Sequence, residues 1–331
     1  MSWPAQAERV GELLPRAQLH PAVLAWAGRR PQAEAWGIAF SGGADSLALL
    51  LLLRAHFPER RLVALHFNHR LRGRAADSDA AFCARVCRAL GVKCVAGVWR
   101  TAPKHASEAV ARAARHDFFD CALKKLRIKA IWFAHQQNDI AESMLMRLAR
   151  GSGTGGLAAP RPVQVQADGR IHLRPLLTLK KAELVAALKR AGAGWREDAS
   201  NAGSDHLRNR IRRSVLPAWI KSAGRDALAG AALSRELLEN DAEALEAWLD
   251  EVKPLDRFGR LDLGRLKGKP VALLRRALHR WLLAVRPQTD LSRQGFNQLL
   301  AAVERGRDTR FSLGARGFAV VRRAQLKFQR S

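Results

Sequence analysis

Acidic residues are scarce in this chain. It has 30 Asp and Glu against 57 Lys and Arg in 331 residues, so its formal net charge is +27. Because neutralising phosphates releases counterions, such an excess favours a polyanionic partner. A generally basic proteome would give the same balance, and a membrane surface is another polyanion. No segment reaches the roughly 18 consecutive apolar residues of a spanning helix, so we expect no membrane partner and favour nucleic acid.

Cysteine is also rare, and the four residues present never form a C-x-x-C pair. They are Cys83, Cys87, Cys94 and Cys121. The N-terminal stretch lacks the basic start and apolar core of a signal peptide. Both absences indicate a reduced, cytoplasmic protein rather than a disulfide framework. The first two cysteines lie four residues apart on one face of an expected helix, where packing is their ordinary role.

Long apolar runs are missing too. Short apolar runs alternate instead with longer stretches of helical pattern. The expected strands are residues 36–40, 61–67, 92–99 and 130–135, and the expected helices follow Ser46 and cover residues 77–90, 107–126 and 140–150. Continuously apolar strands separated by helices predict a mostly parallel sheet covered on both faces. The expected fold class is therefore α/β, a doubly wound, Rossmann-like domain followed by a smaller, mostly helical basic domain.

Composition shifts predict three segments. Residues 1–220 form the larger domain, with its core at 36–160 and a flexible glycine-rich loop after Arg150. Residues 221–252 are expected to be a connecting helix, since residues 236–251 carry seven acids and no base. Residues 253–331 form the basic domain, because residues 264–331 contain 16 Lys and Arg against three acids. Helices over 178–191, 206–220, 271–284 and 292–304 and a hairpin over 310–328 complete the expected elements.

The stretch AFSGGADSLALLLLL, residues 39–53, places a polar loop between an apolar strand and an apolar helix. Backbone N–H groups and the helix dipole at such a junction attract an anion. Gly42 and Gly43 are expected to permit positive φ and a close approach of the ligand. Ser41 and Ser46 can donate to phosphate oxygens, and Asp45 could orient the loop or hold Mg²⁺. No Walker A pattern occurs, so the loop is a different kind of phosphate cradle, formed by Ser41, Gly42, Gly43, Ala44, Asp45 and Ser46.

This S-G-G-x-D-S pattern resembles the PP-loop of the N-type ATP pyrophosphatases. Six further motifs follow in order, and they are HFNHRLRGRAADSDAAFC, SEAVARAARHDFF, FAHQQNDIAESMLMRLARGSGTGGL, RPLL, WREDASN and LRNRIRRSVLP. Together they resemble tRNA(Ile)-lysidine synthetase over roughly residues 36–220. The basic remainder is similar to the tRNA-binding module of that family.

The resemblance implies a ligase that uses ATP and Mg²⁺. ATP would adenylate the wobble cytidine in the CAU anticodon of tRNA(Ile), and free L-lysine would then replace AMP. The product, lysidine, changes codon recognition from AUG to AUA. The implied partners are therefore this tRNA and lysine, while the oligomeric state stays open.

The resemblance also assigns site residues. Asp45, Asp139 and Glu142 would be catalytic, and the last two would bind lysine from one face of a helix at the sheet's C-terminal edge. His66 and His135 would contact ATP. The expected tRNA contacts are Arg115, Arg208, Asn209 and Arg212. Plainer roles are a favourable charge at a helix N-terminus for the two carboxylates, satisfied surface histidines, and solvated arginines.

One motif departs from the family. The usual A-H-H-x-D-D-Q-A-E-T is A-H-Q-Q-N-D-I-A-E-S here, with Gln136, Asn138 and Ile140 at the altered positions. A different amine specificity is thus an open alternative. A tRNA thiolase is another, disfavoured by the absence of C-x-x-C. Amide-forming relatives would not need so basic a C-terminal module. A non-catalytic tRNA-binding protein would not need the intact loop.

Overall fold

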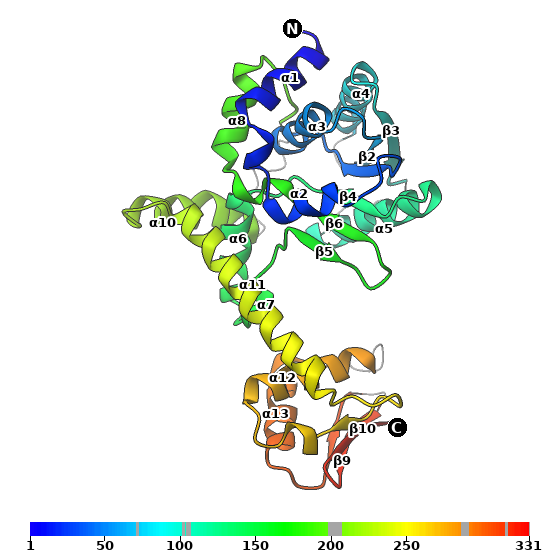
Figure 1. The fold of residues 1–331 in the computed structure, drawn as a ribbon, viewed down its shortest axis with the longest axis vertical. Helices are drawn as coiled ribbons and strands as arrows, with labels where there is room; N and C mark the ends of the chain where they lie inside the picture. Colours follow the sequence, from blue (N-terminus) through cyan, green and yellow to red (C-terminus); the bar gives the residue numbers. More distant parts are fainter. Residues whose placement is uncertain are drawn as a thin grey trace. The chain divides into compact units, whose positions relative to one another are not determined.

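The computed structural model of this chain describes residues 1–70, 73–100, 103, 107–197, 207–285, 291–314 and 317–330. It divides into two compact units, Met1–Leu238 and Glu239–Ser331 (Figure 1). The division falls inside the helix α11, Ala227–Val252, which contains the acidic stretch expected to connect the domains. Among the described residues, no helix is both long and apolar enough to cross a membrane.

The first unit is built on a six-stranded sheet in the order β3-β2-β1-β4-β6-β5. Its strands are β1 Trp36–Ala39, β2 Leu62–Asn68, β3 Lys93–Val98, β4 Ala130–Trp132, β5 Val163–Val165 and β6 Ile171–Leu173. All neighbouring pairs are parallel except β5 with β6. This confirms the α/β prediction and adds the two strands β6 and β5, which the sequence did not suggest.

Helices cover both faces of this sheet because alternate strand residues point to opposite sides. Trp36 and Ile38 belong to the core shared with α1 Trp3–Leu13, α2 Pro21–Gly28, α3 Ala44–His56, α4 Arg74–Ala89 and α8 Lys181–Arg190. Val63, Leu65 and Ile131 face the other way and pack against α5, Glu108–Leu126.

The leucine run after the loop is explained by burial on every side. All residues from Ser46 to Leu53 in α3 are buried. One side of α3 packs in the core with the sheet, and its other neighbours include α1 and α8. A helix enclosed by three elements needs no polar face, so its sequence shows no amphipathic alternation.

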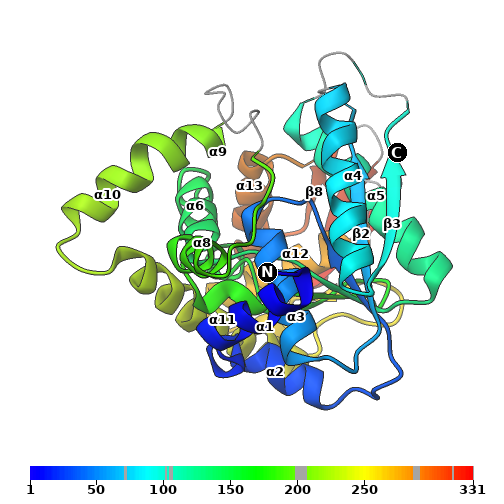
Figure 2. The same cartoon turned by 90° about the horizontal axis from the view of Figure 1, so that it is seen from above.

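The end of the first unit contains several short helices. They are α6 Gln137–Leu148, α7 Thr154–Leu157, α9 Leu207–Arg210, a π-helical turn Ile211–Val215 and α10 Leu216–Ser222. The expected flexible glycine-rich loop instead contains α7, and the Arg147 side chain donates to the Gly156 carbonyl. The expected helix over 206–220 is interrupted by the π-helical turn, and residue 206 lies outside the described residues. The helix α9 and the π-helical turn contact α6, and Figure 2 shows α9 near it.

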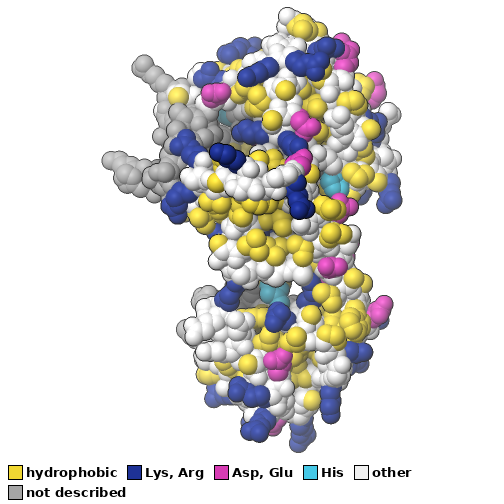
Figure 3. All heavy atoms as spheres, turned by 90° about the vertical axis from the view of Figure 1, so that its left-hand side faces the viewer, with side chains coloured by type: hydrophobic (Ala, Val, Ile, Leu, Met, Phe, Trp, Pro, Cys, Tyr) yellow, Lys and Arg dark blue, Asp and Glu magenta, His cyan; other side chains and the backbone are white. Residues whose placement is uncertain are grey.

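The second unit has its own core. The helices α12 Val271–Ala284 and α13 Arg293–Glu304 match the expected ones. A four-stranded antiparallel sheet accompanies them, in the order β7-β10-β9-β8, with β7 Leu261–Asp262, β8 Thr309–Ser312, β9 Gly317–Arg322 and β10 Gln325–Arg330. Leu273, Trp281, Leu299 and Val321 are among its buried core residues. The sequence predicted the hairpin but not β7. On the face in Figure 3, Lys and Arg side chains are spread over both units.

Candidate functional site

The polar loop between β1 and α3 is closed by its own serines. The Ser46 hydroxyl donates to the Gly43 carbonyl (3.0 Å) and accepts from the Ser41 backbone N–H (3.2 Å). The two serine hydroxyls lie 3.0 Å apart. Because the Ser46 proton is already used, Ser41 is the donor of that bond. The Ser41 hydroxyl in turn accepts from the Gly43 N–H (3.3 Å). The loop is therefore held in shape without a ligand.

The two glycines of the loop differ. Gly42 has φ +87°, and a Cβ there would lie 3.0 Å from the Cys83 sulfur. Gly43 has φ −73° and is the N-cap of α3. The expectation of positive φ at both positions is thus right for Gly42 and wrong for Gly43. At Gly43 the absence of a side chain leaves the N-terminus of α3 open to a ligand.

Arg196 fixes the loop from outside. Its backbone N–H donates to the Gly42 carbonyl (2.9 Å). Its side chain donates to Asp79 (2.7 Å) and to the Ser78 hydroxyl (3.3 Å), both on α4. The sequence motif Trp195–Asn201 contains this arginine, but nothing in the sequence alone predicts that it ties the loop to α4. Residues 198–201 of that motif lie outside the described residues.

Three of the residues expected to bind ATP each have a buried polar atom that lacks a hydrogen-bond partner among the described residues. These atoms are Oδ1 of Asp45, Nε2 of His66 and Nδ1 of His135. Burial raises the pKa of Asp45 to about 6, with Lys181 lowering it and Asp139 raising it. His66 donates from Nδ1–H to the Phe40 carbonyl (3.0 Å). Burial lowers the pKa of both histidines, so both are neutral near pH 7.

The two expected lysine-binding carboxylates lie together on the first turns of α6. Asp139 accepts from the Gln136 N–H (3.1 Å), which closes a capping box at the start of the helix. Glu142 is only 1% exposed. Because β1 and β4 are parallel neighbours, the loop after β1 and the helix after β4 lie at the same sheet edge, where Asp139 helps to raise the pKa of Asp45.

Two of the arginines expected to contact tRNA form ion pairs with these carboxylates. Arg208 donates to Glu142 (2.8 Å) and to Asp139. Arg212 donates twice to Glu142, from Nε (2.6 Å) and from Nη2 (2.9 Å). The π-helical turn begins between the two arginines, and both reach α6. The structure thus brings together residues that the sequence assigned to two different ligands.

Each departure from the family motif has a structural role. The Gln136 side chain accepts from the Asn138 N–H (2.6 Å) and so caps α6. The Asn138 carbonyl oxygen accepts from the Lys181 N–H at the start of α8 (3.1 Å). Ile140 is fully buried in a small core with Leu177 and other residues. A neutral amide and an apolar side chain therefore suit this site without creating a new charge.

Arginines surround His135 at the ends of β4 and β6. The pKa of His135 is lowered first by burial and then by Arg174, Arg208, Arg112 and Arg115. Arg115 thus lies within electrostatic reach of the site. Asn209 precedes the π-helical turn on α9, beside Arg208.

Arg174 is a site neighbour that the sequence indicated only as part of the RPLL motif. It is 7% exposed. Its guanidinium donates to the Arg161 carbonyl (2.7 Å) and to Gln164 (3.2 Å), and its Nε lacks a partner among the described residues.

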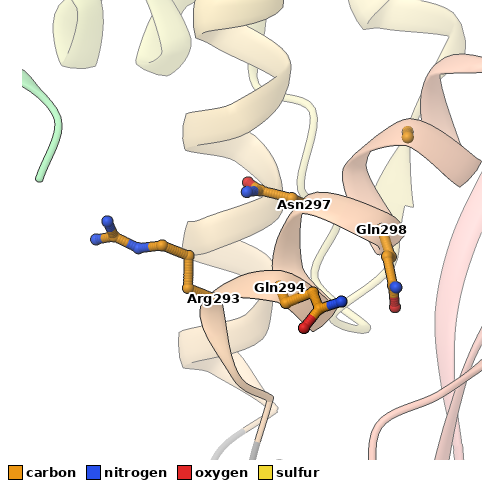
Figure 4. A pocket seen from close by; sticks show the side chains of 5 residues that line it. Arg293, Gln294, Asn297 and Gln298 are labelled. Carbon is orange, nitrogen blue, oxygen red and sulfur yellow. The ribbon is translucent and has the colours of Figure 1, made fainter. Parts of the chain in front are cut away.

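A pocket of about 370 Å³ opens beside Glu142. An acid, an amide, two lysines, an arginine and apolar side chains line it, namely Asn138, Glu142, Lys181, Arg212, Leu216, Pro217, Ile220 and Lys221. It offers negative charge, an apolar wall and positive charge in one cavity. Another depression lies on α13 of the second unit and is lined by Arg293, Gln294, Asn297 and Gln298 (Figure 4). That depression contains none of the expected site residues.

The two buried cysteines do not form a reactive centre in the described part of the chain. Cys83 and Cys87 are buried in the first core, as their spacing predicted. Burial raises the pKa of Cys83, and a hydrogen bond with Cys94 together with burial raises that of Cys87. Both therefore remain protonated thiols. Among the described residues, no group of three His, Cys, Asp or Glu side chains is arranged to hold a metal ion.

The PP-loop domain family matches residues 18–219 of this chain. The tRNA(Ile)-lysidine synthase of Geobacter sulfurreducens is 35% identical over 278 residues, which cover 79% of this chain and 57% of that protein. The enzyme of the same name from Gloeobacter violaceus is 35% identical over 297 residues, covering 89% and 88%. The Bacillus subtilis enzyme is 34% identical over 216 residues, which cover 63% of this chain and 45% of that protein. The chain thus spans only about half the length of some relatives.

Among solved structures, a U34-tRNA thiolase, NcsA from Methanococcus maripaludis with its [4Fe-4S] cluster, is similar with a TM-score of 0.53. The match covers 71% of this chain and 78% of the thiolase at 15% identity. At this level of identity the likeness concerns the fold alone.

Proposed function

Because the chain belongs to the tRNA(Ile)-lysidine synthase family of PP-loop proteins, we propose that it attaches free lysine to a cytidine of an isoleucine tRNA at the expense of ATP. In the first step the cytidine C2 oxygen attacks the α-phosphorus of ATP, and the bond to pyrophosphate breaks. In the second step the lysine ε-nitrogen forms a bond to C2, the C–O bond to AMP breaks, and the amine loses a proton.

The observation that carries this proposal is the meeting of two elements at one sheet edge. The loop of Ser41–Ser46 offers the N–H groups at the start of α3 to phosphates, and the carboxylates of Asp139 and Glu142 lie at the start of α6. Asp45 interacts electrostatically with Asp139, Lys181 and Arg212, so the loop and the carboxylates belong to one site. A site for a nucleotide next to a site for an amine is what aminolysis of an adenylated base requires.

Asp45 fits a role in holding Mg²⁺. Its Oδ1 is buried and unpartnered among the described residues, and a carboxylate oxygen is a ligand that Mg²⁺ prefers. The part of the chain that the structure describes contains no cluster of three potential ligands. That suits an ion held by one carboxylate together with phosphates and water. Mg²⁺ at this position would neutralise charge on the phosphates.

The pocket beside Glu142 fits a lysine molecule. The Glu142 carboxylate would accept from the ε-ammonium group of the lysine, and Leu216, Pro217 and Ile220 would contact its methylene chain. Lys181 and Lys221 would attract the α-carboxylate. These complementary parts support free lysine as the nucleophile over a small uncharged amine.

Arg208 and Arg212 give the site a way to couple RNA binding to lysine binding. Both now neutralise Glu142, and Arg208 also binds Asp139. A lysine ammonium entering the pocket would compete for the same oxygens. We propose that an arginine released from these carboxylates turns to a phosphate of the tRNA, which reconciles its observed ion pair with its expected tRNA contact.

The test is incorporation of labelled lysine into isoleucine tRNA with a CAU anticodon, in the presence of ATP and Mg²⁺, with methionine tRNA as the control. Label in the isoleucine tRNA alone, with one pyrophosphate released per lysine, is the expected result. Pyrophosphate release without lysine transfer would reject lysine as the nucleophile. No tRNA-dependent pyrophosphate release would reject the adenylation step itself. Asp45→Ala should abolish that release, and unchanged turnover would remove the loop from the reaction.

A further inference from the structure

A tight turn in the second unit presents an aromatic side chain to solvent. The turn joins Leu255 to Leu261, which form an isolated β-bridge. The Asp256 carboxylate accepts from the N–H groups of Phe258 (2.8 Å) and Arg260 (2.9 Å). The indole of Trp281, a core residue of α12, donates to the Gly259 carbonyl (3.0 Å). The turn is therefore held in one conformation by the unit beneath it.

Phe258 at the tip of this turn is 65% exposed. Fully burying a phenylalanine contributes about 1.5–3 kcal/mol, and the fold does not use that contribution here. The guanidinium groups of Arg257 and Arg260 lie 4.8 Å and 5.2 Å from the ring centroid. Both distances lie within the range of cation–π attraction.

The surroundings of the turn are basic. Residues 253–269 contain six Lys and Arg and two acids, and all six cations are exposed. Both acids serve the backbone, since Asp256 caps the turn and Asp262 accepts from the Gly264 N–H (2.9 Å). Arg260 lies 3.8 Å from the Asp256 carboxylate in an exposed pair. An exposed pair of this kind contributes little, so a phosphate can replace the carboxylate.

We propose that Phe258, with Arg257 and Arg260, is a stacking platform for an unpaired nucleotide of the RNA substrate. A base stacks on the ring when one guanidinium leaves the ring face and binds the adjacent phosphate. Aromatic faces and guanidinium planes are what proteins use to hold unstacked RNA bases. An acidic peptide would use the cations but not the ring. This inference rests on the proposed function for the presence of RNA and adds which residues contact it and how.

The experiment measures binding of the full-length protein to isoleucine tRNA over a range of salt concentrations. Phe258→Ala should raise Kd by about 5- to 150-fold, the effect of losing one stacked base. The slope of log K against log salt should not change, because a stacked base releases no counterions. Arg260→Ala should instead make that slope less steep by about 0.7–0.9. Phe258→Trp should restore affinity, and Leu283→Ala, at another exposed apolar residue of the unit, should leave it unchanged.

Several outcomes would overturn the platform. Equal Kd for wild type and Phe258→Ala would do so, as would a loss that Phe258→Trp does not restore. A flatter salt slope in Phe258→Ala would mean that the ring only positions cations. If the wild type releases pyrophosphate with tRNA but Phe258→Ala binds tRNA normally, only the platform fails. If the wild type neither binds the tRNA nor releases pyrophosphate, the proposed function fails with it.

Discussion

At the scale of single residues, the phosphate loop needs its two glycines for different reasons. Gly42 adopts a left-handed conformation in a crowded place, against Cys83 and Phe82. Gly43 has an ordinary φ, and the nearest atom to a Cβ there would be 3.5 Å away. The first position is required by the fold of the loop, and in the proposed function the second leaves room for the phosphates of ATP.

Gly42→Ala and Gly43→Ala should therefore separate stability from ATP binding. The first adds a strained φ costing about 1–2 kcal/mol, plus a close contact with Cys83. Its free energy of unfolding should fall by at least that amount. Gly43→Ala should change stability by less than about 1 kcal/mol but weaken ATP binding by blocking the helix N-terminus. Chemical denaturation and ATP titration of both variants check this, and equal stabilities would contradict it.

Glu142→Gln tests the amine side of the site. It removes the charge that Arg208 and Arg212 share and that a lysine ammonium would use. We expect the KM for lysine to rise about tenfold or more, while tRNA-dependent pyrophosphate release continues. Because a broken buried ion pair costs about 3–5 kcal/mol, thermal unfolding must be measured alongside. Lys221→Gln, which removes a cation that lines the same pocket, should raise the same KM without lowering stability. Unchanged lysine KM in both variants would remove the pocket from lysine binding.

At the scale of elements, local pattern predicted most of what positions the site, and long-range contacts account for the rest. The junctions β1–α3 and β4–α6 follow from apolar runs ended by polar residues, so the positions of Asp45 and Asp139 were predictable. The pairing of Arg208 with Glu142 joins residues 66 apart in sequence. Strands β5 and β6 have three residues each and too little alternation to be recognised. The π-helical turn also leaves no recognisable local signal.

Two half-buried histidines, one on α5 and one on β6, predict that acid lowers the stability of the first unit. His116 and His172 have ring centroids 6.3 Å apart. Burial lowers the pKa of each to about 4, assisted by Arg112 for His116 and by Arg174 for His172. Unfolded, each would titrate near 6.5, so the unfolded chain binds more protons between pH 6.5 and 4. Stability should therefore fall as the pH drops through that window.

His172→Gln should reduce this loss because it removes one of the two histidines. Urea denaturation at pH 7 and pH 5 should show a smaller difference in unfolding free energy for the variant than for the wild type. Between pH 8 and 9 both histidines are almost entirely neutral in either state, so the unfolding free energies of wild type and variant should change in parallel there. An identical loss of stability in acid would show that other groups cause it.

At the scale of the whole molecule, the chain has separate cores that share one helix. The core of the first unit includes Leu51 in α3, and that of the second includes Leu278 in α12. α11 contributes residues to both units, with Leu228 packed in the first and Leu249 in the second. The acidic stretch was recognisable in the sequence, but its helix begins nine residues before residue 236, where the apolar positions belong to the first unit. The composition of α11 therefore predicted that this segment connects the two units, but it did not predict where the helix begins.

Separate cores predict two unfolding transitions in calorimetry. Leu51→Ala should lower the unfolding free energy of the first unit, and Leu278→Ala that of the second. We expect about 2–5 kcal/mol in each case, since both side chains are fully buried, so each substitution shifts one transition to lower temperature. ATP with Mg²⁺ binds only the first unit in the proposed function. It should therefore raise the transition that Leu51→Ala lowers, by about 2.7 kcal/mol at a hundredfold excess over Kd, and leave the other in place. A single transition shifted by both substitutions would show that α11 couples the two cores into one cooperative unit.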